Sequence, residues 1–353
     1  MAPAQRVPVG ARRRVAIVAG DAGRLLALRE PLLRALVERG HKILCLTGRA
    51  ADTDAAAYSA LGVELGVFPQ KDERISTLGD RAAVANLTRS LGDWKPAVVL
   101  GIGLKPGLLA ARAARRVGGA RVVVIPTSLA GVAGPGSDRP GMALRWRVRR
   151  DLNSVDALVL YYPEQEALLR GLELLGPGPA VHLVAGPGVD LQRFAPRPMP
   201  PIGSGLVFTM ICTRSSESGV FEYCEAARRV KLKSPDVRFL LALRSEYRQA
   251  WLPALDLRQY QDCIVEVDAG GDVRELLAGC HVLVAPGHTG GFAQGVAQAM
   301  ASGRPAIMAR VEGCRDLVDE RVSGVMVEPG DAVGLAAALE SFLKRPGQVE
   351  WMG

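Results

Sequence analysis

The chain has 353 residues, a length that favours two domains over one. Hydrophobic residues make up 48% and charged residues 23%, which is typical of folded globular proteins and excludes a largely disordered chain. The net charge of +8 is unevenly divided. Residues 1–200 carry 28 Lys and Arg against 17 Asp and Glu, whereas residues 201–353 carry 16 against 19. Any attraction to an anionic partner is therefore expected in the first half.

The six cysteines lie far apart, and no two have CxxC spacing, so no structural zinc site is expected. Most lie in apolar runs such as Ile43–Leu46 and are interpreted as small buried residues in a reducing compartment. After the basic start at Arg12–Arg14, the apolar run Val15–Ala19 is too short for a signal peptide. No stretch approaches the roughly 18 apolar residues of a membrane span. We expect a cytoplasmic protein.

Short β-branched runs alternate with longer amphipathic stretches along the first half. A buried strand is predicted at Val15–Ala19, and a helix over about residues 25–39 then ends at Gly40. Further elements are predicted as strands at Lys42–Thr47, Ala97–Ile102, Arg121–Ile125, Val155–Tyr161 and Val181–Ala185, and as a helix at Leu108–Val117. Continuous apolar strands that alternate with helices predict a parallel sheet covered on both faces.

Four prolines between Pro196 and Pro201 cannot continue a helix or a central strand, so residues 196–203 are predicted to be an interdomain linker. The alternation then restarts, with strands predicted at Leu206–Ile211, Val237–Ala242, Cys263–Val267, His281–Ala285 and Pro305–Met308, and helices at Val220–Lys233, Val273–Ala278, Phe292–Ala301 and Ala332–Lys344. The predicted fold class is α/β, with two doubly wound Rossmann-like domains facing a cleft. Their predicted limits are 14–195 and 204–353, after a disordered basic N-terminus of residues 1–13.

A glycine-rich turn near residue 290 carries the clearest chemical signal. A strand ends at Pro286, the turn opens a helix, and that helix closes at Gly303. Backbone N–H groups at such a helix start suit a phosphate or sugar oxygen. The earlier loop Gly20–Gly23 lacks the GxGxxG spacing and is not followed by a P-loop lysine, so it gives little support to NAD or ATP binding.

The segment from Val282 to Pro305, with its Gly-Gly-Phe turn and its Ala-Met-Ala-Ser-Gly-Arg-Pro block, resembles the retaining glycosyltransferases of family 4. The resemblance continues at Gly313–Val318, Val322–Val327, Pro329–Asp331, Gly186–Phe194 and Thr213–Gly219. In the first half, Leu28–Leu32 and Leu104–Gly107 resemble the branch that adds sugars to lipid-linked precursors of bacterial surface polysaccharide. The resemblance covers nearly the whole chain from about Arg14. It implies the two-domain GT-B fold, with the donor on the C-terminal domain and the acceptor on the basic N-terminal domain.

The resemblance also implies donor-binding residues. Arg214 matches the family's diphosphate-binding arginine, and Glu217 matches the glutamate of the same loop. Ser218 stands where the family has a lysine. Two glutamates of the family, eight positions apart, are replaced by Gly290 and Gln298. Gln298 can still hydrogen-bond a ribose, because an amide both donates and accepts.

Other residues are candidates for the roles of the replaced groups. Gly290, Gly291 and Phe292 form the turn that offers backbone N–H groups to the donor. His288 precedes this turn, and Ser128 stands where the family often has a histidine, so both are candidate catalytic residues. Arg244 follows a predicted strand and is a further candidate for the donor site. Arg274, which opens a predicted helix, is a third candidate of this kind. His288 also has a plain interpretation as a loop residue, and Arg244 and Arg274 as solvated surface residues.

The first half supplies candidate acceptor contacts. Arg29 and Lys105 are predicted to lie in loops after strand ends, where they would face an anionic acceptor or the donor phosphate, or simply be surface charges. The segment from Arg139 to Arg150 carries five arginines around Met142, Leu144 and Trp146 and is predicted either to touch an anionic membrane surface or to be a solvated helix face. Aromatic residues make up only 5% of the chain and no nucleic-acid-binding module is recognised, so no nucleic-acid partner is expected.

The function that the resemblance implies is transfer of a sugar from a nucleotide sugar, UDP-linked in preference to GDP-linked, to a lipid-linked or saccharide acceptor with retention. No metal and no cofactor is expected, because cationic side chains and helix ends neutralise the leaving diphosphate. The alternative is a non-catalytic relative acting as a binding or scaffolding subunit, since several of the family's charged groups are replaced. A third possibility is another GT-B enzyme such as a nucleotide-sugar epimerase. The family's closing helix, which crosses back to the N-terminal domain, is expected to be absent or supplied otherwise. The protein is expected in the cytoplasm, peripheral on the inner membrane if the basic segment binds lipid.

Overall fold

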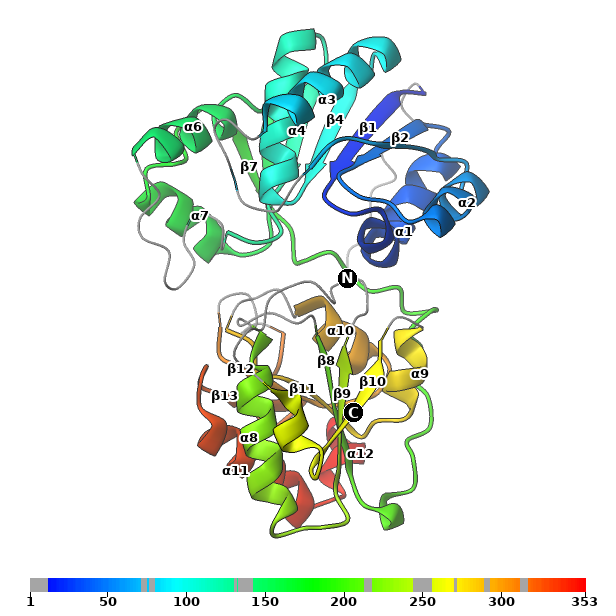
Figure 1. The fold of residues 1–353 in the computed structure, drawn as a ribbon, viewed down its shortest axis with the longest axis vertical. Helices are drawn as coiled ribbons and strands as arrows, with labels where there is room; N and C mark the ends of the chain where they lie inside the picture. Colours follow the sequence, from blue (N-terminus) through cyan, green and yellow to red (C-terminus); the bar gives the residue numbers. More distant parts are fainter. Residues whose placement is uncertain are drawn as a thin grey trace, which may run out of the picture. The chain divides into compact units, whose positions relative to one another are not determined.

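The computed structural model describes residues 12–70, 75, 80–129, 132, 142–212, 218–243, 256–269, 272–288, 293–311 and 317–353. The chain divides into two compact units, Met1–Pro187 and Gly188–Gly353, and each is built on one parallel sheet (Figure 1). The predicted α/β class with two doubly wound units is confirmed. The domain limits given above remain a prediction, as does the disordered N-terminus, of which Arg12 and Arg13 are described.

The first unit has a sheet of seven described strands in the order β3-β2-β1-β4-β5-β6-β7. The strands are β1 (Arg14–Ala19), β2 (Lys42–Thr47), β3 (Glu64–Val67), β4 (Val98–Ile102), β5 (Arg121–Ile125), β6 (Ala157–Leu160) and β7 (Ala180–Leu183). The helices are α1 (Ala22–Glu38), α2 (Asp52–Ala60), α3 (Arg81–Trp94), α4 (Leu104–Val117), α6 (Met142–Leu152) and α7 (Pro163–Gly171).

Alternate side chains of β1 pack in two separate cores, because successive side chains of a strand point to opposite faces of the sheet. Ala16 and Val18 pack in the core that contains α3, α4 and α6, whereas Val15 and Ile17 pack in the core that contains α1 and α2. Both sets are buried, which explains the continuous apolar run of this strand. The sheet is therefore covered on two faces, as the strand pattern predicts.

Two glycines let α4 approach the sheet closely. A Cβ added to Gly107 would overlap the Val124 side chain of β5, and a Cβ added to Gly101 of β4 would overlap Gly107 itself. Residues Leu104–Ala114 of α4 are all buried, including its charged members. The helix thus lies in the interior of the first unit.

The second unit has six described strands in the order β10-β9-β8-β11-β12-β13. The strands are β8 (Val207–Cys212), β9 (Arg238–Leu243), β10 (Ile264–Asp268), β11 (Val282–Ala285), β12 (Ala306–Ala309) and β13 (Gly324–Val327). The helices are α8 (Val220–Lys231), α9 (Val273–Ala278), α10 (Ala293–Ala301), α11 (Ala332–Lys344) and α12 (Gln348–Met352), with short 3-10 helices at Ile202–Ser204 and Leu257–Tyr260. Helices α8, α11 and α12 share one core, and α9 and α10 share another.

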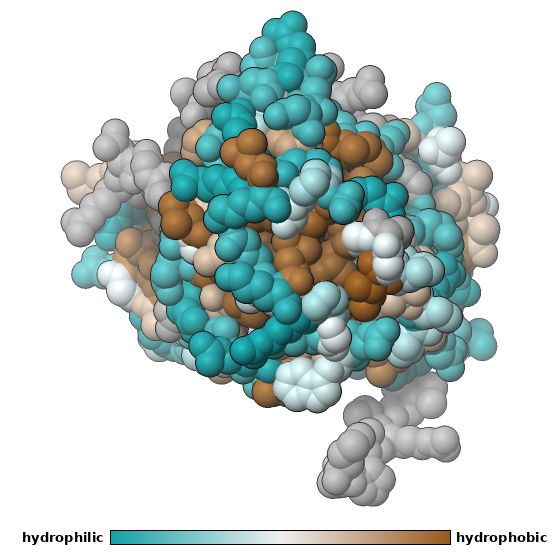
Figure 2. Space-filling view, turned by 90° about the horizontal axis from the view of Figure 1, so that it is seen from below, coloured by the Kyte–Doolittle hydropathy of each residue, from teal (hydrophilic) through white to brown (hydrophobic). Residues whose placement is uncertain are grey.

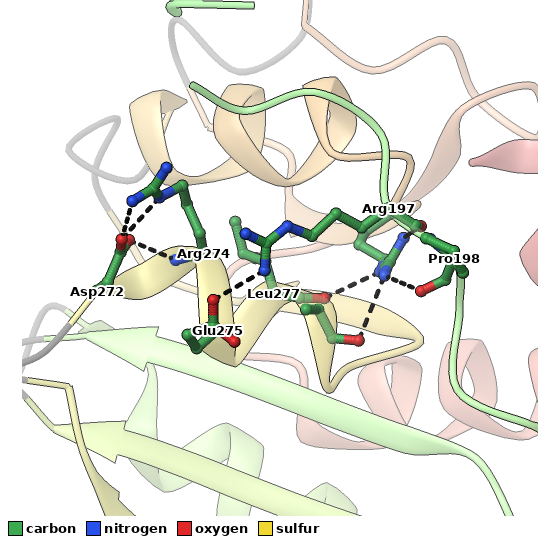
Figure 3. Close-up of polar contacts among 8 residues, drawn as sticks. Arg197, Pro198, Asp272, Arg274, Glu275 and Leu277 are labelled. Atoms are coloured by element: carbon green, nitrogen blue, oxygen red, sulfur yellow. Dashed lines mark hydrogen bonds and ion pairs between the residues drawn. The ribbon is translucent and has the colours of Figure 1, made fainter. Parts of the chain in front are cut away.

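The Pro-rich segment packs on the second unit through Arg304, whose side chain is 1% exposed. Its Nε donates to the Leu277 carbonyl at 2.9 Å, and its two Nη atoms donate to the carbonyls of Arg197 (2.8 Å) and Pro198 (3.0 Å). The carbonyls at the end of α9 carry partial negative charge, which offsets the buried guanidinium. Arg197 also donates to Glu275 at 2.8 Å (Figure 3).

The surface seen from below carries hydrophilic residues between exposed apolar patches (Figure 2). Exposed large apolar side chains of the second unit include Leu232 and Trp351. Among the helices that the structure describes, none is both long and apolar enough to cross a membrane.

Candidate functional site

Each sheet reverses its strand order at one point. In the first unit the reversal lies between β1 and β4, and in the second between β8 and β11. At such a point the two following helices leave toward opposite faces, and the crevice beyond the carboxyl ends of the strands is where ligands bind in open α/β sheets. Each unit therefore has a candidate site of its own, built from the residues that follow β1 and β4 in the first unit and β8 and β11 in the second.

Small residues line the carboxyl edge of the first sheet. Gly20 follows β1 and Gly48 follows β2, and a Cβ on Gly48 would stand 2.7 Å from Gln70 Oε1. Gly103, at φ +96°, follows β4, and a Cβ there would lie 4.0 Å from Thr127 Oγ1. Gly48 is buried against Gln70 and Gly103 lies against Pro106, so these glycines allow neighbouring segments to pack closely at this edge.

The prediction that Arg29 and Lys105 lie in loops is wrong. Arg29 lies inside α1, where its guanidinium donates to the Tyr161 hydroxyl at 2.9 Å. Lys105 lies in the first turn of α4, and its Nζ is 3.0 Å from Asp80 Oδ1. Both cations are buried, at 8% and 6% exposure, so the interpretation as surface charges is also wrong. Whether either residue contacts an acceptor stays a prediction.

Lys105 belongs to a buried charge network on one side of α4. Arg112, two turns further along, lies 3.8 Å from Asp80 and donates to Asp151 of α6. Arg115 reaches the same Asp151 from the surface at 4.0 Å. Buried cations need such partners, because burying an unpaired charge in a protein costs roughly several kcal/mol of folding free energy. The network ties α3, α4 and α6 together beneath the carboxyl edge.

In the second unit the loops after β8 and β11 touch. Gly219, at φ +74°, precedes α8, and a Cβ there would come within 2.6 Å of the Pro286 carbonyl oxygen. Ser218, which precedes it, is fully buried. Glycine at position 219 therefore allows both the left-handed backbone and the close approach of the two loops.

The two loops place a carboxylate against an imidazole. His288, which follows β11, has its Nε2 2.9 Å from Glu222 Oε1 in the first turn of α8. The His288 side chain is 32% exposed and the Glu222 side chain 13%. An ionised carboxylate only accepts, so Nε2 carries the hydrogen. The arrangement fixes the ring at the point where the strand order reverses.

Other polar groups follow neighbouring strands of the same sheet. Gln298 lies half-buried in α10, and its amide is hydrogen-bonded to none of the residues that the structure describes. At the end of β10, Asp272 caps α9 and binds the Arg274 side chain (Figure 3), and this contact lowers the pKa of the Asp272 carboxyl. Arg310, after β12, binds Glu320 and Glu328, each at 3.2 Å.

Several predicted site residues lie outside the described residues, namely Arg214, Glu217, Arg244, Gly290, Gly291 and Phe292. Ser128 is described and exposed, just after β5 at the carboxyl edge of the first sheet. His288 and Gln298 both follow β11, as predicted. No cluster of His, Cys, Asp or Glu suited to a metal ion occurs among the described residues.

Three acidic partners, Glu222, Asp80 and Asp151, are not predicted from the sequence. The one sequence signal for Glu222 is its place in the first turn of a predicted helix, where a carboxylate is favoured by the helix dipole. Nothing in the spacing of Asp80 or Asp151 indicates that they meet α4.

Two family models match the chain, one for each unit. A glycosyl transferase 4-like domain matches residues 27–187, and the model of glycosyl transferases group 1 matches residues 206–345. The chain belongs to the group 1 glycosyltransferases. Both halves of this glycosyltransferase-family protein are thus accounted for, as the resemblance implies.

Curated relatives of this group 1 family member also carry glycosyltransferase names. WcaL of Escherichia coli strain K12, named for colanic acid biosynthesis, is 26% identical over 215 residues, which cover 54% of this chain and 53% of WcaL. D-inositol 3-phosphate glycosyltransferase of Geodermatophilus obscurus is 29% identical over 188 residues, covering 48% of this chain and 42% of that protein. The matches thus span about half the length of these relatives.

Solved structures share the fold over nearly the whole chain. HepE of Anabaena, crystallised with UDP and glucose, has a TM-score of 0.72 and 14% identity, over 97% of this chain and 92% of HepE. Sucrose-phosphate synthase of Thermosynechococcus elongatus has a TM-score of 0.73 and 17% identity, with the same coverage of the two chains. At this identity the comparison establishes the shared GT-B fold alone.

Proposed function

We propose that this chain transfers a sugar from a UDP-linked donor to a lipid-linked or saccharide acceptor, with retention of configuration, in the synthesis of a surface polysaccharide. The observation that carries the proposal is the match of one glycosyltransferase model to each of the two units. The name of WcaL supports the polysaccharide context, and the UDP in the HepE crystals supports the donor class.

The donor is proposed to bind at the carboxyl edge of the second sheet, where the strand order reverses. Arg214 would neutralise the diphosphate, and Glu217 and Arg244 would contribute to the same loops. The turn Gly290–Phe292 would offer N–H groups, and Gln298 would hold the ribose hydroxyls. The half-buried amide of Gln298 is compatible with this role, since it has no hydrogen-bond partner among the described residues.

The acceptor is proposed to bind the first unit, which is the basic half of the sequence. Ser128 lies exposed at the carboxyl edge of its sheet. Arg29 and Lys105 would act from within α1 and α4 and set the positive potential beneath this edge. Among the described residues, three basic side chains, Lys105, Arg112 and Arg115, contact the two carboxylates of Asp80 and Asp151. This excess of positive charge favours an anionic acceptor.

Contact with an anionic membrane is proposed through α6, the described part of the segment from Arg139 to Arg150. Met142, Trp146 and Arg149 lie at helical spacing, with Met142 87% exposed and Trp146 58% exposed. The Arg150 guanidinium stacks 5.4 Å from the centre of the Trp146 ring. An aromatic ring flanked by arginines is suited to the boundary between headgroups and acyl chains. With this contact, the protein would be a cytoplasmic protein bound peripherally to the inner membrane.

The second candidate function is a non-catalytic scaffolding subunit. It is favoured by the replacement of two glutamates by Gly290 and Gln298 and of a lysine by Ser218, because removing one charged contact to a transition state costs about 100-fold or more in rate. The variant Arg214→Ala separates the two functions. Loss of the biological phenotype in a folded Arg214→Ala protein supports the enzyme, and an unchanged phenotype supports the scaffold.

The direct test is incubation with UDP- and GDP-linked sugars and a membrane lipid extract, together with calorimetry against UDP and GDP. We expect UDP binding and appearance of glycosylated lipid. Absence of both turnover and nucleotide binding at millimolar concentration would exclude the enzymatic proposal.

A further inference from the structure

The pair formed by Glu222 and His288 joins two segments that are 66 residues apart in the sequence. Glu222 belongs to α8, which follows β8, and His288 belongs to the loop after β11. These strands are hydrogen-bonded neighbours, and the strand order reverses between them. The pair therefore stands at the point of the second sheet where an α/β fold binds its ligand.

The contact fixes which edge of the imidazole can meet a ligand. Nε2 is committed to Glu222 at 2.9 Å, whereas Nδ1 is hydrogen-bonded to none of the described residues. Gly330, in the loop after β13, lies beside the imidazole ring. A Cβ added to Gly330 would be 3.8 Å from Cε1 of His288. Since about a third of the side chain remains exposed, Nδ1 is left as the ring atom for an outside partner.

The charge of the surroundings indicates what that partner would be. In the described parts of the loops after β8 and β11, residues 218–219 and 286–288, His288 is the one basic side chain. The first turn of α8 adds the partial positive charge of a helix N-terminus. With Nε2 bound to the Glu222 carboxylate, Nδ1 is the ring nitrogen left for a ligand, and a hydrogen on Nδ1 would be donated to an anionic oxygen.

We propose that His288, held by Glu222, donates a hydrogen bond from Nδ1 to the diphosphate of the nucleotide donor. The inference rests on the proposed function and deepens it. During transfer, the bond between the anomeric carbon and the diphosphate oxygen breaks, and its electron pair stays on that oxygen. The acceptor hydroxyl oxygen bonds to the same carbon, and its proton passes to the leaving diphosphate. His288 stabilises the charge that develops on the leaving oxygen, which makes it a catalytic residue, and Glu222 is a positioning residue.

Calorimetry with UDP and with uridine monophosphate tests this assignment. A charged hydrogen bond contributes roughly twice as much as a neutral one, so we expect His288→Gln to weaken UDP binding about ten-fold. The affinity for uridine monophosphate should change less than about two-fold, because that nucleotide lacks the second phosphate. Glu222→Gln should weaken UDP binding in the same direction, and the double variant should be no weaker than His288→Gln alone.

Glu225→Gln is the matched control, since Glu225 lies one turn further along α8 and accepts from the Tyr260 hydroxyl. UDP affinity and kcat should be unchanged in this variant. In His288→Gln, kcat should fall with little change in the KM for the acceptor, which a general loss of folding would not produce. His288→Lys supplies a positive charge at this position and should restore UDP binding in the Glu222→Gln background.

The outcomes separate the inference from the proposed function. If the wild-type protein binds UDP and His288→Gln binds it equally well, the role of His288 is refuted while the proposed function stands. If neither UDP nor GDP binds the wild-type protein, both are refuted. Should His288→Gln fail to fold, the ¹⁵N spectrum of the wild-type histidines decides, because UDP must shift the Nδ1 signal of His288.

Discussion

His281 illustrates how one buried side chain makes stability depend on pH. The ring is fully buried, accepts from the Val207 N–H through Nδ1 at 3.0 Å, and contacts the Pro200 carbonyl through Nε2. Protonation of Nδ1 would place its N–H against the Val207 N–H and break this hydrogen bond. Burial, with the nearby charges of Arg304 and Arg238, lowers the pKa of His281 below its usual 6.5.

The folded state therefore resists protonation more than the unfolded chain does. The contribution of neutral His281 to the free energy of unfolding is fully present above about pH 6.5. It decreases as the pH falls below that value, by up to about 1.4 kcal/mol per pH unit. We expect the free energy of unfolding, measured by denaturant titration, to show this decline in the wild type. His281→Asn should be less stable at pH 7.5 but flatter between pH 7 and 5. His182→Asn, at an exposed position of β7, should keep the wild-type slope, and an equal slope in His281→Asn would contradict the assignment.

The burial of the cysteines is predicted correctly from the apolar runs in which they lie. Five of them are buried and free, and the sixth, Cys314, lies outside the described residues. Burial raises the pKa of Cys45, Cys224 and Cys280 to about 12 and that of Cys263 to about 11. Since the thiolate is the reactive form, these thiols should be inert at pH 8.

We expect at most one thiol to react with an aromatic disulfide reagent in the native protein and all six after unfolding. The Cys314→Ser variant should remove any fast phase. A fast-reacting thiol that persists in this variant would contradict the burial of the other five.

The pairing of Glu222 with His288 could not be predicted at this scale. Sequence spacing placed His288 near the glycine-rich turn, which is a local relation. Its partner comes from another strand–helix unit and meets it only because β8 and β11 are neighbours in the sheet. A pattern of a few residues carries no information on strand order, so the carboxylate was overlooked.

At the scale of elements, the packing of α4 depends on Gly107. A Cβ at this position would overlap Val124 of β5, and both backbone segments are buried. We expect Gly107→Ala to lower the free energy of unfolding by about 2 kcal/mol, because the helix must move away from the sheet despite the better helix propensity of alanine. Chemical denaturation measures this directly.

The control for this prediction is Gly171→Ala at the end of α7, where a Cβ would meet nothing within 4 Å. Its stability should stay within about 0.5 kcal/mol of the wild type. If Gly107→Ala were equally harmless, the close approach of α4 would not be a constraint on the fold.

The same helix explains which elements could be predicted from the sequence. Apolar runs located the central strands, such as β1 and β8, because these are buried on both faces. The sequence predicts this helix only from Leu108, whereas α4 begins at Leu104 and includes Lys105. Proline is tolerated in the first turn of a helix, where its missing N–H has no partner to lose, and Gly107 serves the contact with the sheet. Short or weakly apolar elements such as β3, which has no buried residue, show no recognisable pattern in the sequence.

At the scale of the whole molecule, the uneven charge is the feature that links sequence to partner. The first 200 residues carry the positive excess, and α6 presents part of it beside exposed apolar side chains. In contrast, the exposed Arg229 of α8 lies in the half with a slight negative excess. Charge alone does not distinguish a membrane from any other polyanion, but the exposed Trp146 and Met142 next to arginines favour a lipid surface.

Binding to lipid vesicles tests this link. We expect the protein to sediment with vesicles that contain phosphatidylglycerol and not with vesicles of phosphatidylcholine alone. Each arginine near an anionic surface contributes about 1 kcal/mol, so a variant with both Arg149→Gln and Arg150→Gln should bind about 30-fold more weakly. Trp146→Ala should also weaken binding, through loss of the apolar anchor, whereas Arg229→Gln should leave it unchanged. Equal loss in Arg229→Gln would mean that overall charge, rather than α6, holds the protein on the membrane.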